Sequence, residues 1–150
     1  MLKRRLGKFM LEVAEDKTRI LPIGRFKGTK DEFDFLGFTF FNAKTREGKY
    51  RLGIRTSKKK LKAKRQAAKA WLRTRMVRPI PETMMRVAAI IRGHCNYYGV
   101  NGNLRSLYKF HDYMKQMTHK MLNRRSQKGY VTNEKFQRVW DYYVAPPKLT

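Results

Sequence analysis

Acidic residues and cysteines are scarce in this chain. Eleven Asp and Glu residues stand against 36 Lys and Arg residues in 150, which gives a formal net charge of +25. Such an excess is costly in self-repulsion unless a polyanion neutralises it, so the balance favours a partner that carries many phosphates. The single cysteine, Cys95, excludes an intrachain disulfide and a zinc site built on a cysteine pair, and it fits a reducing compartment.

Long apolar runs are also lacking. No stretch approaches the length of a membrane span, and residues 1–16 contain no continuous apolar core of signal-peptide length. Glu12, Glu15 and Asp16 are atypical of an organelle transit peptide, because such peptides are poor in acidic residues. We therefore expect a cytoplasmic protein without a membrane partner, with an organellar location left open.

The apolar content is nevertheless sufficient for a folded core. Hydrophobic residues make up 41% of the chain and aromatic residues 13%, which is more than a disordered basic segment usually carries. The length suits one domain or two small subdomains. We expect an α+β fold, with a helix and a β-hairpin segment in residues 1–56 and a mainly helical three-helix unit in residues 57–150.

The N-terminal part shows both helical and strand patterns. Residues 2–13 have apolar side chains at helical spacing, which predicts a helix packed on a sheet, and residues 19–23 predict a strand. The aromatic-rich residues 33–41 predict one buried strand, and residues 50–54 predict another. A turn at residues 47–48 would join these two strands into a hairpin.

Three acidic residues cluster just before the aromatic segment. We expect these residues to cap a loop rather than to hold metal ions: Asp31, Glu32 and Asp34.

The C-terminal part is dominated by helical periodicity. Residues 57–78 contain ten basic residues and no acid, and they predict a basic amphipathic helix ended by prolines at 79 and 81. Its apolar stripe should hold Leu61, Ala68 and Leu72, with Ala67 and Trp71 beside it. Two further core helices follow. The inner face of the first should hold Met84, Val87, Ala88, Ile91 and Cys95, and that of the second should hold Leu104, Leu107, His111, Met114, Thr118 and Met121. A last short helix should pack through Phe136, Val139, Trp140 and Tyr143.

The densest positive cluster lies in residues 57–69. A run of charge usually forms a solvated face, but so many cations without an acid favour contact with phosphates. The candidate RNA-binding residues here are Lys58, Lys59, Lys60, Lys62, Lys64 and Arg65.

A second candidate cluster surrounds the glycine-rich turn at residues 99–103. Aromatic side chains beside Arg and Asn can stack on unpaired bases and bond their edges. The residues of this cluster are Arg92, Asn96, Tyr97, Tyr98, Arg105 and Lys109, and the two tyrosines fit a core role equally well. Arg124 and Arg125 form a third candidate group at the end of a helix, where favourable interaction with the helix dipole explains them as easily.

The residues that could support metal or covalent chemistry do not form a recognisable pattern. His94 and Cys95 are neighbours on a helix and point apart, and the spacing from His111 to His119 matches no usual zinc motif. We expect no metal site, no cofactor and no catalytic residue.

Four segments, in this order, resemble the group II intron reverse transcriptase and maturase family over nearly the whole chain. EDKTRILPIG (15–24) resembles the palm segment downstream of the polymerase site, and FDFLGFTF (33–40) resembles the segment that places the primer end. SKKKLKAK (57–64) and RGHCNYYGVNGNLRSLYKFHDYM (92–114) resemble the maturase domain, also called domain X or the thumb. The resemblance implies a palm remnant in residues 1–56 and an RNA-binding maturase domain in residues 57–150.

The resemblance also implies roles for particular residues. Lys17 matches the palm lysine near the incoming nucleotide, and the primer-positioning strand is matched by Phe35, Leu36, Gly37 and Phe38. The family's aromatic-x-Asp-Asp metal site has no match here, so these roles are expected to be vestigial. We interpret Phe35 and Phe38 as side chains packed in a hairpin rather than as primer-positioning residues.

These patterns lead to three hypotheses. The leading one is a maturase-type module that binds structured, intron-like RNA and supports its folding or splicing without polymerase activity of its own. The second is the C-terminal half of a split RNA-directed DNA polymerase, which would bind an RNA/DNA duplex and a second protein chain over its N-terminal apolar surface. The third is a structural basic protein of a ribonucleoprotein.

Overall fold

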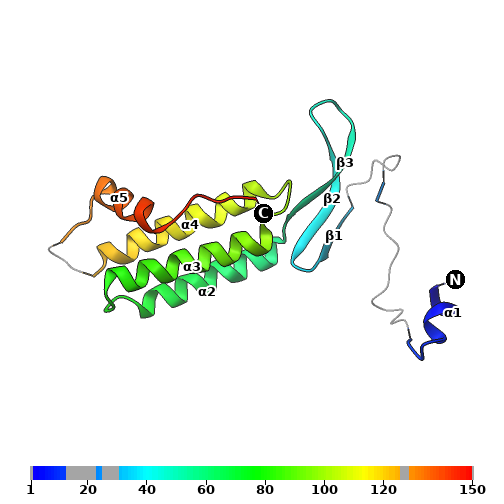
Figure 1. The fold of residues 1–150 in the computed structure, drawn as a ribbon, viewed down its shortest axis with the longest axis horizontal. Helices are drawn as coiled ribbons and strands as arrows, with labels where there is room; N and C mark the ends of the chain where they lie inside the picture. Colours follow the sequence, from blue (N-terminus) through cyan, green and yellow to red (C-terminus); the bar gives the residue numbers. More distant parts are fainter. Residues whose placement is uncertain (1, 13–22, 25–30, 126–128, 150) are drawn as a thin grey trace.

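The computed structural model describes residues 2–12, 23–24, 31–125 and 129–149. A three-stranded antiparallel sheet lies at one end of an elongated helical bundle (Figure 1). This arrangement confirms the α+β fold with a helical bundle. Lys17 and nearly all of the strand expected at 19–23 lie outside the described residues.

The N-terminal helix α1 (Leu2–Gly7) is shorter than the helix predicted over residues 2–13. It ends at glycine, which has a low helix propensity. Phe9, Met10 and Leu11 follow the helix and are exposed. The predicted packing on a sheet is therefore wrong for Phe9 and Met10.

The sheet contains β1 (Glu32–Phe35), β2 (Phe38–Lys44) and β3 (Tyr50–Thr56) in that order. The single strand predicted over residues 33–41 is wrong, because Leu36 and Gly37 form a two-residue turn. Their φ angles of 48° and 82° are both positive, as in the turns that match the twist of a hairpin. A leucine rarely occupies such a position, so composition did not signal this turn. The hairpin between β2 and β3, with Gly48 at φ 79°, is confirmed.

Replacing Gly37 by alanine should destabilise the fold more than the same change at Gly48. Both glycines have a positive φ, which costs an alanine roughly 1–2 kcal/mol. A Cβ at Gly37 would also lie 2.8 Å from the Tyr98 hydroxyl oxygen, whereas nothing lies within 4 Å at Gly48. Urea unfolding should show a loss about 1 kcal/mol larger for Gly37→Ala. Equal losses would contradict a tight contact with Tyr98, and Tyr98→Phe should relieve the difference.

The bundle is built from α2 (Lys58–Thr74), α3 (Ile80–Tyr98), α4 (Leu104–Asn123) and α5 (Asn133–Tyr143). Helices α2 and α4 both start at the sheet end and run in the same direction, while α3 runs back toward the sheet (Figure 1). Pro79 and Pro81 were expected to end α2, but they stand at the beginning of α3. Proline suits a first helical turn, where its missing N–H has no intrahelical partner.

The core follows the predicted helical stripes closely. Most expected inner positions are buried, and Ala67 and Leu104 are exposed. The expected inner positions that are only half-buried are Leu61, Trp71, Cys95, His111, Val139 and Tyr143. The largest side chains that are fully enclosed are Trp140, Phe110, Met84, Leu107 and Met114. The long apolar stripes of α3 and α4 therefore pack against each other and against α5 in one cluster.

Asn103 joins the sheet to the bundle. Its Oδ1 accepts a hydrogen bond from the backbone N–H of Thr56 (2.8 Å). Its Nδ2 donates to the Thr56 hydroxyl (2.9 Å) and to the Tyr98 carbonyl oxygen (2.8 Å). Because Asn103 is only 1% exposed, this amide fixes the end of β3 against the turn between α3 and α4 away from water.

Glu32 and Asp34 do not cap a loop as predicted, because both belong to β1. Asp34 accepts hydrogen bonds from the hydroxyls of Thr39 and Ser57. These two bonds hold the pKa of the Asp34 carboxyl below its usual value. Glu32 pairs instead with Arg55 of β3.

Candidate nucleic-acid interface

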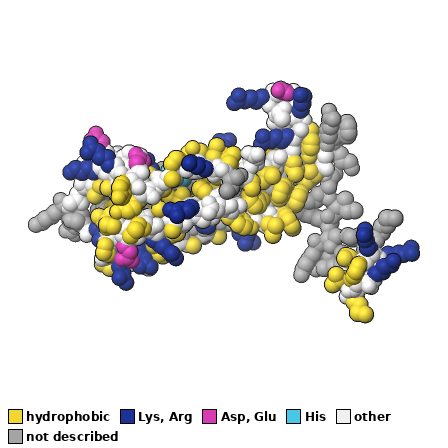
Figure 2. All heavy atoms as spheres, in the orientation of Figure 1, with side chains coloured by type: hydrophobic (Ala, Val, Ile, Leu, Met, Phe, Trp, Pro, Cys, Tyr) yellow, Lys and Arg dark blue, Asp and Glu magenta, His cyan; other side chains and the backbone are white. Residues whose placement is uncertain are grey.

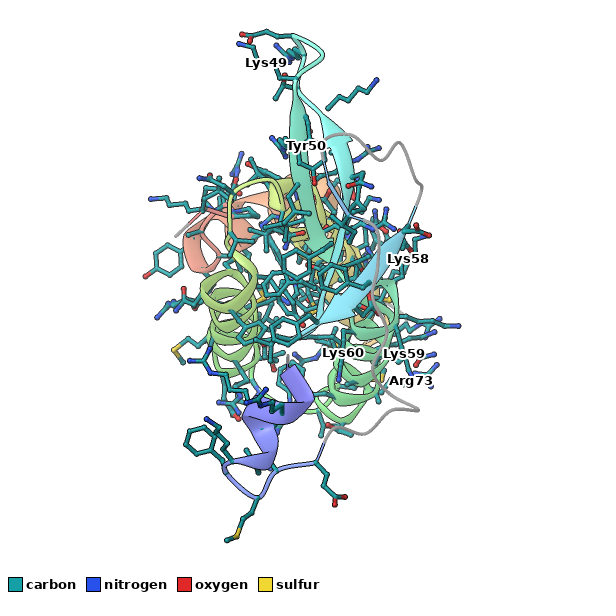
Figure 3. All side chains as sticks on the ribbon, turned by 90° about the vertical axis from the view of Figure 1, so that its right-hand side faces the viewer. Lys49, Tyr50, Lys58, Lys59, Lys60 and Arg73 are labelled. Atoms are coloured by element: carbon teal, nitrogen blue, oxygen red, sulfur yellow. The ribbon has the colours of Figure 1, made fainter. Side chains whose placement is uncertain are left out.

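The N-terminal end of α2 carries one group of exposed, predicted RNA-binding residues. Lys58, Lys59, Lys60 and Lys62 are all exposed, and the first turn contains no acid. Figure 3 shows the first three of these lysines projecting from the end of the helix that adjoins the sheet. Cations at a helix N-terminus oppose the helix dipole. The Asp34 carboxylate, which accepts from the Ser57 hydroxyl at this helix end, is a single negative charge beside four lysines.

Lys64 and Arg65 belong to the packing of the bundle. The Lys64 ammonium lies 5.9 Å from the centre of the Phe110 ring. Arg65 donates to the Lys109 carbonyl oxygen (2.6 Å), and its guanidinium lies 5.0 Å from the centre of the Tyr113 ring. These two cations therefore connect α2 to α4 and are only partly accessible to a ligand.

The two neighbouring tyrosines of the second cluster have different environments. Tyr97 is 55% exposed, and its hydroxyl donates to the Leu36 carbonyl oxygen (2.9 Å). Its ring stacks on Phe38 at 5.9 Å between centres. Tyr98 is only 8% exposed, and burial raises the pKa of its hydroxyl. The prediction that Tyr98 contacts RNA is thus corrected to a core role.

All the remaining predicted contacts except Arg125 are exposed. Arg92 and Asn96 lie on α3, and Arg105 and Lys109 lie on the first turns of α4. Arg124 is exposed directly after α4, where its position also suits the dipole of that helix, and Arg125 is half-buried. The structure therefore places four exposed polar residues of the second cluster on the two helices that meet at the turn.

The primer-positioning segment forms the β1–β2 turn. Phe35 and Leu36 are exposed, so the packed-hairpin interpretation is wrong for Phe35. Phe38 is half-buried and packs on Tyr97 and Tyr98, as that interpretation requires. Hydrophobic side chains gather over the sheet in Figure 2. Phe33 stacks on Phe40, and Phe38 contacts Phe40 with its ring tilted.

Sequence reasoning missed a group of cations at the tip of the β2–β3 hairpin. The exposed cations at the tip are Lys44, Arg46 and Lys49. Arg51 is exposed on β3, and its guanidinium lies beside Gly102. Glu47 is the acid at this tip, and it pairs with Lys49 at 2.9 Å. The tip projects well beyond the helices (Figures 2 and 3). The alternation of Lys and Arg around a predicted turn could have identified them.

The histidines serve the core of the bundle. His94 is fully buried between the rings of Tyr98 and Phe110, and burial lowers its pKa to about 4. His111 accepts a hydrogen bond from the Trp140 indole (3.3 Å), and His119 contacts the Val131 carbonyl oxygen (2.8 Å). In the part of the chain that the structure describes, no group of three His, Cys, Asp or Glu residues is placed to hold a metal ion.

Over residues 2–12, 23–24, 31–125 and 129–149, no helix is long and apolar enough to cross a membrane. Comparison with protein-family models, with curated proteins and with solved structures finds no match for this chain.

Proposed function

We propose that this chain is a maturase-type RNA-binding module that binds structured, intron-like RNA and supports its folding or splicing. The observation that carries the proposal is the exposed lysine cluster at the N-terminal end of α2. These cations oppose the helix dipole, and a phosphate backbone would relieve both that conflict and the mutual repulsion of the lysines.

The neighbourhood of the lysine cluster supports RNA in particular. Tyr97 ends up at the same end of the bundle, because α3 finishes where α2 begins (Figure 1). Its exposed ring can stack on an unpaired base, and Arg92 and Asn96 on the same helix can bond base edges or phosphates. Charge on α2 would then supply affinity, and the α3 end would supply selectivity.

A test of the charge mechanism compares two variants with the same loss of charge. Replacing Lys58, Lys59 and Lys62 by alanine should weaken binding to all RNAs alike. The slope of log affinity against log salt should become shallower by up to about 0.9 for each lost phosphate contact. The matched control replaces Lys135, Arg138 and Lys148, which are exposed in the C-terminal part. Equal losses in the two variants, or affinity that does not depend on salt, would contradict a specific role for α2.

Tyr97 should decide selectivity. Tyr97→Ala should weaken binding to a preferred structured RNA by roughly 1–3 kcal/mol and binding to a random duplex much less. Tyr97→Phe keeps the ring and loses only the hydrogen bond to Leu36, so it should retain selectivity. Affinity and melting temperature should be measured together. A uniform loss on every RNA at an unchanged melting temperature would refute the stacking role.

The exposed apolar residues favour the split polymerase as a second candidate function. Phe9, Leu11, Phe35 and Leu36 are all exposed, and such side chains are typical of a surface covered by another chain. The binding of an RNA/DNA duplex belongs to this candidate.

Under either function the chain alone should extend no primer on an RNA template. Magnesium-dependent incorporation by the purified chain would refute this expectation.

A further inference from the structure

A hollow of about 180 Å³ lies between α2 and α4, toward the ends of the two helices that are remote from the sheet. Its apolar lining consists of Leu72, Met76, Met117 and Met121. Its remaining lining residues are all cations: Lys69, Arg73, Lys120 and Arg124. This α2–α4 hollow therefore combines an apolar surface with positive charge, and no acid lines it.

The apolar lining is suited to a flat group. Leu72 and Met121 are buried and form a firm base, while Met76 and Met117 are half-buried. Methionine is unbranched, and its polarisable sulfur makes favourable contacts with aromatic rings. Half-buried methionines can therefore adjust to a planar ring that enters from solvent.

The four cations are exposed and border the hollow as two pairs, one from each helix. Lys69 and Arg73 are four residues apart on α2, which is about 6 Å along the helix axis. Lys120 in the last turn of α4 and Arg124 directly after it are also four residues apart. Figure 3 shows Arg73 projecting from α2 away from the bundle. The helix dipoles favour cations near both C-termini, but the dipoles do not account for an open apolar hollow between them.

We propose that the α2–α4 hollow binds one unpaired nucleotide of the RNA, with its base against the methionines and its flanking phosphates on the two pairs of cations. This inference rests on the proposed RNA-binding function. A regular duplex would leave the apolar lining unused, because its bases are stacked inside the helix. The exposed lysines at the other end of α2 lie within about 25 Å, since α2 has 17 residues, so one folded RNA can contact both places.

The test uses two RNA hairpins that differ only in a single bulged nucleotide, with 2-aminopurine at the bulge. The unmodified protein should bind the bulged hairpin about tenfold more tightly than the hairpin without the bulge, called the flush hairpin below. The 2-aminopurine emission should change on binding. Met117→Trp fills the hollow and should abolish this preference while leaving the flush hairpin unaffected. Met117→Leu keeps an apolar side chain of similar volume and should retain the preference.

A second variant does not depend on repacking the hollow. Lys69→Ala combined with Lys120→Ala alters only exposed side chains and should weaken binding of the bulged hairpin more than that of the flush hairpin. Equal affinity of the unmodified protein for both hairpins would overturn the inference and leave the proposed function standing. A preference that survives in Met117→Trp at an unchanged melting temperature would also overturn it. If the unmodified protein bound neither hairpin, the proposed function itself would be overturned.

An acidic amphipathic peptide is the competing occupant, because it too combines negative charge with an apolar face. Saturable binding of a model peptide of Glu and Leu, lost in Met117→Trp and accompanied by no bulge preference, would assign the hollow to a protein partner and overturn the proposal.

Discussion

Replacing Asn103 by alanine is expected to lower the free energy of unfolding by about 3 kcal/mol. The change removes three hydrogen bonds in a site that is 1% exposed. It leaves the Thr56 N–H and the Tyr98 carbonyl without the partners that they have in the native fold, and each buried group left unpaired costs about 1–3 kcal/mol. The loss should be measured by urea unfolding, with the melting temperature as a second readout.

Two further variants define what the Asn103 result means. Thr56→Val removes only the hydroxyl that accepts from Nδ2 and should cost about 1 kcal/mol, because the backbone bond to Oδ1 remains. Asn101→Ala changes an exposed residue of the same turn and should leave stability unchanged. If Asn103→Ala behaved like Asn101→Ala, the amide would not hold the sheet on the bundle.

The stability of the fold should fall as the pH is lowered from about 6.5 to about 4, because of His94. This side chain is fully enclosed, and burial, with a smaller contribution from the nearby Lys64 charge, lowers its pKa from 6.5 to about 4. The folded pKa lies below the unfolded value, so the unfolded chain binds the proton first as the pH falls. The stability associated with neutral His94 is thus complete above pH 6.5 and is lost toward pH 4, by about 3 kcal/mol in total.

His94→Leu should flatten this pH dependence. Leucine has no titrating group, and both ring nitrogens of His94 are buried without a hydrogen-bond partner in the described structure, so the variant should be at least as stable at pH 7. Urea unfolding at pH 7, 5.5 and 4.5 measures the difference. Asp34 does not interfere, because its pKa lies below 3.8 and its contribution is lost only at lower pH. The same loss of stability in the variant would show that another group is responsible.

Local periodicity was enough to predict the helices and most of their inner faces. Met84, Val87 and Ile91 recur at intervals of three and four, and all three are buried in α3. The reason is that the spacing of apolar residues along a helix is independent of what the helix packs against. The net charge of +25 likewise comes from composition alone, and with it the expectation of a polyanionic partner.

Contacts between distant segments decided what periodicity could not. Tyr97 and Tyr98 are neighbours with the same chemistry, yet Tyr98 is buried against Phe38 and His94 while Tyr97 stays half exposed. The turn at Leu36–Gly37 was hidden inside an aromatic run, because its positive φ angles come from strand pairing rather than from a typical turn sequence. The α2–α4 hollow exists only because two helices that are separated in the chain by residues 75–103 run side by side. Composition alone therefore led to the expectation of a polyanionic partner, whereas long-range packing determined which side chains remain exposed.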